Sequence, residues 1–145
     1  RRYSSAASDV YKRQAKARDQ GLFEKKHCNW IEKLCQRLDE LIPACRPSLI
    51  HGDLWSGNLL IDTSGHPVLI DPAVYYGHPE MDWAMLSLFG SYPVEALDHY
   101  QNLHPLEKGL NERKDIHQLY PLMVHLILFG KGYLNGVEST LKKYA

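Results

Sequence analysis

The sequence predicts an α+β fold that is mostly helical and contains one small β-hairpin. Apolar residues recur at steps of three and four over residues 15–42 and 113–129, which is the periodicity of amphipathic helices. Between these segments, two short apolar runs at 59–61 and 68–70 flank turn residues that include Asp, Ser, Gly and Pro, a pattern typical of a hairpin. The 145 residues are enough for one domain with a hydrophobic core.

Breaker residues set the limits of the predicted elements. Residues 1–14 have no periodic apolar face, so we expect a non-native or disordered leader there and a domain that covers 15–145. Pro43 ends the first helix, and Gly21 either divides that helix or marks its start. A strand at 49–50 precedes the hairpin. The later helices are separated by glycines and prolines and are expected at 81–89, 94–103, 113–129 (with Pro121 as a kink or late start) and 133–144.

Charge and composition exclude several classes of partner. The chain has 17 basic and 17 acidic residues, so there is no electrostatic case for binding nucleic acid or an anionic membrane. The longest apolar runs are far too short to cross a bilayer. The three cysteines lack metal-ligand spacing and are expected to be buried reduced thiols, which fits a cytoplasmic protein. Four histidines are also scattered without ligand spacing and predict no zinc site: His99, His104, His117 and His125.

Three polar residues stand at the ends of the short apolar runs: Asp53, Asn58 and Asp71. An Asp-x-x-x-x-Asn loop followed by a strand that ends in Asp is the catalytic layout of kinases. In that layout Asp53 orients the substrate hydroxyl and accepts its proton, and is the candidate catalytic residue. Asn58 and Asp71 offer the oxygen ligands that Mg²⁺ prefers when it is shared with the phosphates of ATP. Asp62 is interpreted as a turn residue of the hairpin.

The neighbouring residues carry a family resemblance. Residues 51–58 read His-Gly-Asp-Leu-Trp-Ser-Gly-Asn and resemble the catalytic loop of the aminoglycoside phosphotransferase and choline kinase superfamily. With Trp55 and the segment Asp-Pro-Ala-Val-Tyr-Tyr-Gly-His at 71–78, the chain is similar to the fructosamine kinase (ketosamine-3-kinase) family from about residue 15 onward. The resemblance implies a protein-kinase-like C-terminal lobe whose hairpin carries the catalytic loop. It also implies ATP and Mg²⁺ as cofactors. The implied reaction is phosphorylation of a sugar hydroxyl of ketoamines on glycated amines or proteins, in deglycation.

Three further residues of the loop have predicted roles. His51 is expected to brace the loop rather than to transfer a proton, because the position before Gly-Asp does so in kinases. Gly52 supplies room or an unusual backbone angle beside Asp53. Trp55 either anchors the loop on the core or forms a wall of the substrate pocket, where an indole face suits a sugar or a cation.

The segment after Asp71 is expected to contact the substrate. Tyr76 and His78 belong to a polar aromatic loop beside the metal site. Asp82 either braces the catalytic loop or binds the substrate amine. The family generally carries Glu at that position, so Asp82 is a departure. Pro72 stands where protein kinases have the Phe of Asp-Phe-Gly, and the short connection to the next helix favours a small acceptor.

The features of a nucleotide-binding N-terminal lobe are not found ahead of this loop. Gly21 is the only glycine before Gly52, so there is no Gly-rich phosphate loop, and the early lysines lie in a helical pattern. We therefore expect the N-terminal kinase lobe to be missing. The chain alone would then be catalytically inert and would expose apolar surface where that lobe docks.

Two rival functions stay open. The first is a related phosphotransferase that acts on choline, an aminoglycoside or homoserine. The second is a non-enzymatic domain, either a pseudokinase or a binding module. Tyr76 and His78, with the residues around them, favour the ketoamine substrate over the first rival.

Overall fold

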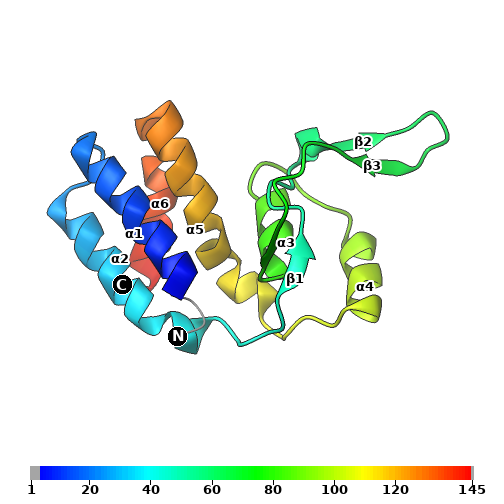
Figure 1. Cartoon of the computed structure of the whole chain (residues 1–145), viewed down its shortest axis with the longest axis horizontal. Coiled ribbons are helices and arrows are strands. Elements are labelled where there is room, and N and C mark those ends of the chain that lie inside the picture. Colours follow the sequence, from blue (N-terminus) through cyan, green and yellow to red (C-terminus); the bar gives the residue numbers. More distant parts are fainter. Residues whose placement is uncertain (1–3, 145) are drawn as a thin grey trace. The chain divides into compact units, whose positions relative to one another are not determined.

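The computed structural model describes residues 4–144, and the side chains from residue 10 onward. The chain divides into two compact units (Figure 1). One contains the chain up to Ala44 together with the part from Leu119 onward, and the other is Cys45–Gln118. The elements are mostly helices with short antiparallel strands, which confirms the predicted α+β class.

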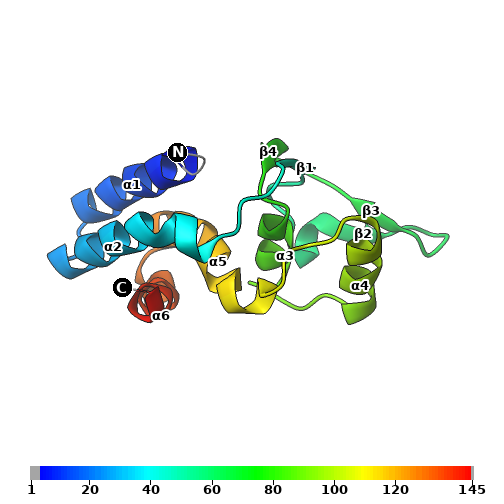
Figure 2. The ribbon, with the colours of Figure 1, turned by 90° about the horizontal axis from the view of Figure 1, so that it is seen from below.

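The first unit is helical. It contains α1 (Ser4–Asp19), α2 (Lys25–Leu41), the second half of α5 (Leu110–Phe129), the 3-10 turn η2 (Lys131–Tyr133) and α6 (Leu134–Tyr144). Helix α2 packs against α6 (Figure 1, Figure 2). The predicted apolar face of α2 forms this core, because its side chains are buried with those of α5 and α6: Ile31, Leu34, Met123, Leu126, Val137 and Leu141.

A buried histidine joins two of these helices. The His27 ring is 1% exposed, and its Nδ1 accepts a hydrogen bond of 2.8 Å from the Glu24 backbone N–H at the start of α2. Because Nδ1 accepts, the proton of the neutral ring lies on Nε2, which donates to Glu138 Oε1 on α6 at 2.7 Å. His27 therefore caps α2 and links it to α6 with both ring nitrogens satisfied.

The first predicted helix is divided. Helix α1 ends at Asp19 and α2 begins at Lys25, with Gly21 between them at φ +69°. A left-handed backbone angle is accessible to glycine and ends a helix, so Gly21 divides the predicted helix. The backbone is helical from Ser4, on both sides of the predicted boundary at residue 15. Residues 1–3 of the predicted leader lie outside the described residues, and the non-native origin of 1–14 stays a prediction.

The second unit contains two small antiparallel sheets. Strand β2 (Leu59–Ile61) pairs with β3 (Pro67–Leu69), which confirms the predicted hairpin. Asp62 closes its turn, because Oδ1 accepts hydrogen bonds of 2.8 Å from the backbone N–H groups of Ser64 and His66. Strand β1 (Ser48–Ile50) pairs with β4 (Tyr75–Gly77). Strand β4 was predicted as a loop. That prediction is wrong, because three residues carry no readable alternation and the partner strand is distant in sequence.

Three helices accompany these sheets, and their bounds differ slightly from the predicted ones. Helix α3 (Glu80–Leu86) is shorter than expected, α4 (Val94–Leu103) matches, and α5 starts at Leu110 and continues through Pro121 without ending. The Gln118 side chain on α5 donates from Nε2 to the Ala84 carbonyl oxygen at 2.8 Å. The core of this unit gathers around α3, where Ala84, Met85 and Leu86 are buried.

The hairpin and the neighbouring strands carry exposed apolar side chains. Leu60, Ile61, Val68 and Leu69 of β2 and β3 are 39–65% exposed. A hairpin this short does not bury its own apolar residues, so these side chains offer a surface to another segment or protein. None of the helices described between residues 4 and 144 has the length and hydropathy that crossing a bilayer requires.

Candidate active site

The predicted catalytic loop leaves β1 through Gly52, whose φ is +80°. A Cβ atom at this position would overlap the Ala73 carbonyl oxygen and lie 2.9 Å from Cε1 of Tyr75. The backbone therefore needs glycine for two reasons, the left-handed angle and the close approach of the chain around residue 73. This is the room beside Asp53 that the sequence predicts.

Asp53 and Asn58 are in direct contact. The Asn58 side chain is 6% exposed, and its Nδ2 donates to the Asp53 carbonyl oxygen at 2.9 Å and to Asp53 Oδ2 at 3.3 Å. Because the amide nitrogen makes both bonds, the carbonyl oxygen Oδ1 is the atom that Asn58 can offer to a cation. The 3-10 turn η1 (Ser56–Asn58) brings the two residues together across the loop.

Asp71 lies at the same end of the hairpin as Asn58. The β2–β3 register pairs Leu59 with Leu69, and the Ile70 N–H donates to the Asn58 carbonyl oxygen at 3.0 Å, so Asp71 follows directly beside the loop. Of the described residues other than glycine, Asp71 alone has a positive φ, +51°. Such an angle costs on the order of 1 kcal/mol, less for Asp than for most residues, and it is one of the backbone features that cluster at functional sites. The three predicted residues thus converge on one end of the hairpin.

His51 links the loop that carries Asp53 to the segment around Asp71. Its Nε2 donates to the Ile70 carbonyl oxygen at 3.0 Å, because a carbonyl oxygen can only accept, and Nδ1 is left as the acceptor nitrogen of the ring. That nitrogen accepts from the Asp53 N–H at 3.4 Å. The His51 carbonyl oxygen also accepts from the Ala73 N–H at 2.9 Å. The ring therefore has its nitrogens engaged by backbone groups on either side of the site, a geometry that supports the bracing role.

Asp82, which lies on α3, binds the backbone of the same loop. Its Oδ2 accepts from the His51 N–H at 2.7 Å and its Oδ1 from the Gly52 N–H at 2.9 Å. With both oxygens occupied by backbone donors, the geometry supports a brace more directly than a contact to the substrate amine.

The three aromatic candidates are placed differently. Trp55 is 40% exposed and its indole lies over Gly57, where a Cβ would overlap the ring. Tyr76 is 75% exposed on β4, opposite Leu49. His78 points instead to the cluster around Glu80: its Nδ1 accepts from the Glu80 N–H at 3.3 Å, and its ring lies 4.8 Å from that of His117. Trp55 and Tyr76 are thus accessible to a ligand, and His78 is half-buried in the unit.

Comparison with known proteins agrees with this geometry. The sequence model of the family described as fructosamine kinase matches residues 10–145. The chain belongs to the fructosamine kinase family. It is 52% identical over 98 residues to a "Probable ketoamine kinase" of Enterococcus faecium, covering 68% of this chain and 35% of that protein. It is 44% identical over 129 residues to a "Probable ketoamine kinase" of Lactiplantibacillus plantarum, covering 83% of this chain and 46% of the relative.

Solved structures of the fructosamine kinase family share the fold. The crystal structure of a "putative fructosamine-3-kinase" from Thermobifida fusca superimposes with a TM-score of 0.83 at 38% identity, covering 90% of this chain and 46% of that one. A second, from Haemophilus somnus, has a TM-score of 0.73 at 28% identity. The likeness confirms the predicted kinase-like C-terminal lobe. The chain spans a third to a half of the length of these relatives.

A buried ionic cluster in this family member was not predicted from the sequence. Glu80, the first residue of α3, is 0% exposed. The Arg113 guanidinium donates from Nε to Glu80 Oε2 at 2.7 Å and from Nη2 to Oε1, and His117 Nε2 lies 3.2 Å from Oε2. Burial raises the pKa of Glu80, but the hydrogen bonds from His117 and Arg113 and the charges of His78 and Arg113 outweigh it and bring the pKa down to about 2. Glu80 is therefore a carboxylate at neutral pH.

The cluster also has the composition of a metal site, since ligand atoms of His78, Glu80 and His117 lie within 4.8 Å of one another. His117 was predicted to have no ligand partners, because it lies more than thirty residues after His78 and Glu80 in the sequence. The Arg113 guanidinium, however, already neutralises Glu80 through two hydrogen bonds and would repel a cation at this point. We therefore interpret the cluster as an ion-pair network.

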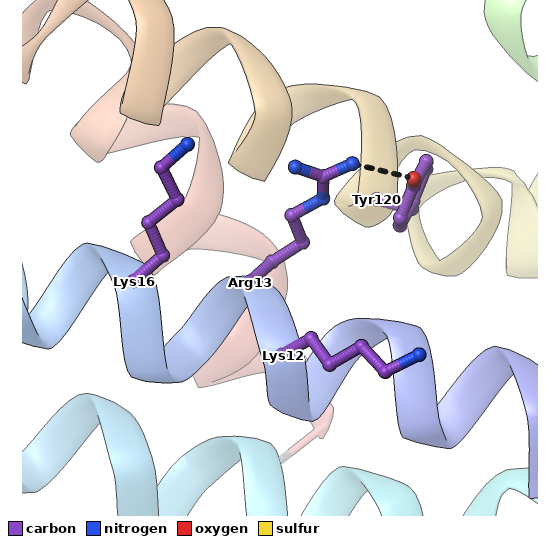
Figure 3. A pocket seen from close by; sticks show the side chains of 4 residues that line it. All are labelled: Lys12, Arg13, Lys16 and Tyr120. Atoms are coloured by element: carbon purple, nitrogen blue, oxygen red, sulfur yellow. Dashed lines mark hydrogen bonds between the residues drawn. The ribbon is translucent and has the colours of Figure 1, made fainter.

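The first unit has a hollow of its own, shown in Figure 3. It is lined by Lys12, Arg13, Lys16 and Tyr120, and Arg13 Nη2 donates to the Tyr120 hydroxyl oxygen at 3.2 Å. None of these four lining side chains is a carboxylate or an amide, so the described part of the hollow offers no group of the kind that binds Mg²⁺ or orients a hydroxyl. The candidate active site is the loop and hairpin of the second unit.

Proposed function

We propose that the full-length protein transfers the terminal phosphoryl group of ATP to a sugar hydroxyl of a ketoamine. The observation that carries the proposal is the contact between Asp53 and Asn58, with Asp71 beside them at the end of the hairpin. The names of the relatives, ketoamine kinase and protein-ribulosamine 3-kinase, support the substrate class. Such a protein would act in deglycation of amines or proteins.

Asp53 is the residue proposed to meet the substrate. Its carboxylate accepts the hydrogen bond of the attacking hydroxyl and takes the proton as the new O–P bond forms and the bond to the leaving ADP breaks. The bond from Asn58 Nδ2 holds one carboxylate oxygen, which orients the other toward the acceptor. With the loose transition state of phosphoryl transfer, orientation matters more than the basicity of Asp53.

The residues present fit a magnesium ion. Asn58 Oδ1 is a neutral carbonyl oxygen and Asp71 is a carboxylate, and one or two such ligands are what Mg²⁺ takes from a protein when phosphate and water supply the rest. When bound, the ion neutralises charge on the phosphates and aligns them for transfer. The role proposed for the two side chains is to present their oxygens at one point, and the buried amide of Asn58 and the place of Asp71 at the same end of the hairpin support it.

The relatives are longer than this chain, and the remaining residues of the nucleotide site are proposed to lie in the part of the full-length protein that corresponds to their additional length. We propose that an N-terminal lobe covers the exposed apolar residues of β2 and β3, where Leu60, Ile61, Val68 and Leu69 would otherwise face water. Cys28, Cys35 and Cys45 are free and half-buried, which supports a reducing cytoplasmic location.

The test uses the protein expressed from its complete reading frame, with fructosyl-lysine and ATP. We expect Asp53→Asn to lower kcat by at least about 100-fold, which is the usual contribution of a positioned acid or base. Asp62→Asn is the matched control, because Asp62 is a carboxylate of the same segment that only closes the hairpin turn. If Asp53→Asn retains wild-type turnover, the assignment of Asp53 is refuted.

A substrate panel separates the rival functions. The same protein is offered choline, an aminoglycoside, homoserine and fructosyl-lysine, with ADP release as the readout. Turnover of the ketoamine alone supports the proposal, turnover of choline or an aminoglycoside favours the related phosphotransferases, and no ATP-dependent turnover of any of them favours a non-enzymatic domain.

A further inference from the structure

We propose that Glu80, held by Arg113 and His117, is a positioning residue for the catalytic loop and acts through Asp82. The inference rests on the proposed function for its effect on turnover, whereas its geometric part is independent of any activity. All residues involved belong to the second unit, Cys45–Gln118. The sequence pattern offered bracing of the loop as one of two roles for Asp82, but it assigned no such role to Glu80, Arg113 or His117.

The first link runs from α5 to the start of α3. Arg113 makes a two-pronged ion pair with Glu80, and His117, one turn further along α5, contacts the same carboxylate. The Arg113 guanidinium also donates to the Glu107 carbonyl oxygen at 2.6 Å, which fixes the arginine itself. A buried, two-pronged pair of this kind specifies direction as well as distance, so it sets where α3 begins.

The second link holds the other end of α3. Gln118 on α5 donates from Nε2 to the Ala84 carbonyl oxygen at 2.8 Å and to Ser87 Oγ at 3.0 Å. Helix α3 has only 7 residues and no side-chain cap at its N-terminus, and a helix of that length is not stable alone in water. Its position therefore depends on these contacts from α5, at Glu80 on one end and at Ala84 and Ser87 on the other.

The third link runs from α3 to the catalytic loop. Asp82 lies two residues after Glu80 in the first turn of α3, and its carboxylate accepts the backbone N–H groups of His51 and Gly52. A shift of the start of α3 moves Asp82 with it and weakens or redirects both bonds. Glu80 and Asp82 are thus two carboxylates on one short helix, one anchored in the core and the other holding the loop.

The last link reaches the reacting groups. Asp53 follows Gly52 directly, and the His51 ring is bonded to the Ile70 carbonyl oxygen, next to Asp71. A displacement of residues 51–52 therefore moves Asp53 and also the backbone next to Asp71. Misplacement by about 1 Å is enough to lower a rate on the order of 100-fold, so a loss of the Glu80 anchor is expected to be visible in kcat.

The kinetic test compares two single variants and their combination in the full-length protein. We expect Glu80→Gln and Asp82→Asn each to lower kcat by about 10- to 100-fold with KM for ATP and the ketoamine unchanged. The double variant should be no worse than the more affected single variant, because both residues act along one route. Glu95→Gln is the matched control, since Glu95 is an exposed carboxylate in the first turn of α4. If the fold-losses in kcat of the two single variants multiply in the double variant, Glu80 does not act through Asp82.

A spectroscopic test needs no turnover. Backbone amide protons that bond to a carboxylate resonate downfield and exchange slowly. We expect the His51 and Gly52 amide signals of Glu80→Gln to move upfield and exchange faster, whereas Glu95→Gln leaves them unchanged. Because this readout is independent of catalysis, it stays decisive even if the wild-type protein phosphorylates nothing in the panel.

A second variant keeps the proposal falsifiable if Glu80→Gln does not fold. The removal of Glu80 alone leaves the buried Arg113 charge unpaired, whereas Glu80→Gln combined with Arg113→Gln leaves no unpaired charge. The same two measurements are then made on that protein. A folded variant of either kind with wild-type kcat and unchanged His51 and Gly52 amide signals would overturn the proposal.

Discussion

Replacement of Gly52 by alanine tests how tightly the catalytic loop is built. The φ of Gly52 is +80°, and an alanine in the left-handed region costs about 1 kcal/mol. Its Cβ would also overlap the Ala73 carbonyl oxygen and lie 2.9 Å from the Tyr75 ring, an overpacking that costs about 1–3 kcal/mol more. We therefore expect Gly52→Ala to lower the free energy of unfolding by about 2–4 kcal/mol.

The hairpin supplies the control for this change. Gly65 has nearly the same φ, +84°, but nothing lies within 4 Å of a Cβ built there. Gly65→Ala should therefore lower the free energy of unfolding by only about 1 kcal/mol and leave kcat unchanged. The measurement is urea unfolding of both full-length variants, with kcat measured alongside. Equal destabilisation by the two changes, or wild-type kcat in Gly52→Ala, would refute the role of the contact with Ala73.

Two further predictions concern the buried carboxylate and the exposed indole. The folded-state pKa of Glu80, about 2, lies below its ordinary 4.5, so Glu80 contributes about 3 kcal/mol of stability above pH 4.5 that is lost as the pH falls toward 2. Acid unfolding of the wild type against Glu80→Gln measures this contribution, and equal pH slopes for the two would contradict it. Gly57→Ala places a Cβ against the Trp55 indole and forces the ring aside. If Trp55 forms a wall of the substrate pocket, KM for the ketoamine rises with stability retained. If Trp55 is only an anchor of the loop, stability falls and KM stays the same. A Gly57→Ala variant with wild-type stability and wild-type KM would exclude both roles of Trp55.

The candidate site was predicted from residues that lie close together in the sequence, and its catalytic and metal-binding roles stay predictions. Asp53, Asn58 and Asp71 lie within one loop and one hairpin, so Asp53 contacts Asn58 and Asp71 follows the strand end that pairs beside Asn58. The hairpin itself is encoded by two branched apolar runs and a turn, and β2 and β3 form where they were predicted. The same holds for the amphipathic face of α2, which is periodic over four turns and buries the residues that the periodicity selects.

The features that the sequence did not reveal depend mainly on contacts between distant residues. Strand β4 exists because Tyr75–Gly77 meets β1, and three residues carry no pattern that reveals such a partner. The sequence also did not reveal that the His78 ring packs on His117, which is on α5, and the contact of His78 with the substrate stays a prediction. Of the two outcomes expected at Pro121, the late start is excluded, because α5 runs from Leu110 to Phe129, and the kink stays a prediction.

The amino-acid sequence by itself determined the family and predicted the catalytic loop with the types of group that the loop presents, because these depend on residues within one short segment of the chain. Only the tertiary structure decided which carboxylates are held and by what. Glu80 and Asp82 look alike in the sequence, as two acids that open a helix. Folding buries the first against Arg113 and His117 from α5 and turns the second to the backbone of the loop. The reason is that burial and hydrogen-bond geometry depend on which segments pack together, and the order of residues along a single segment does not record that.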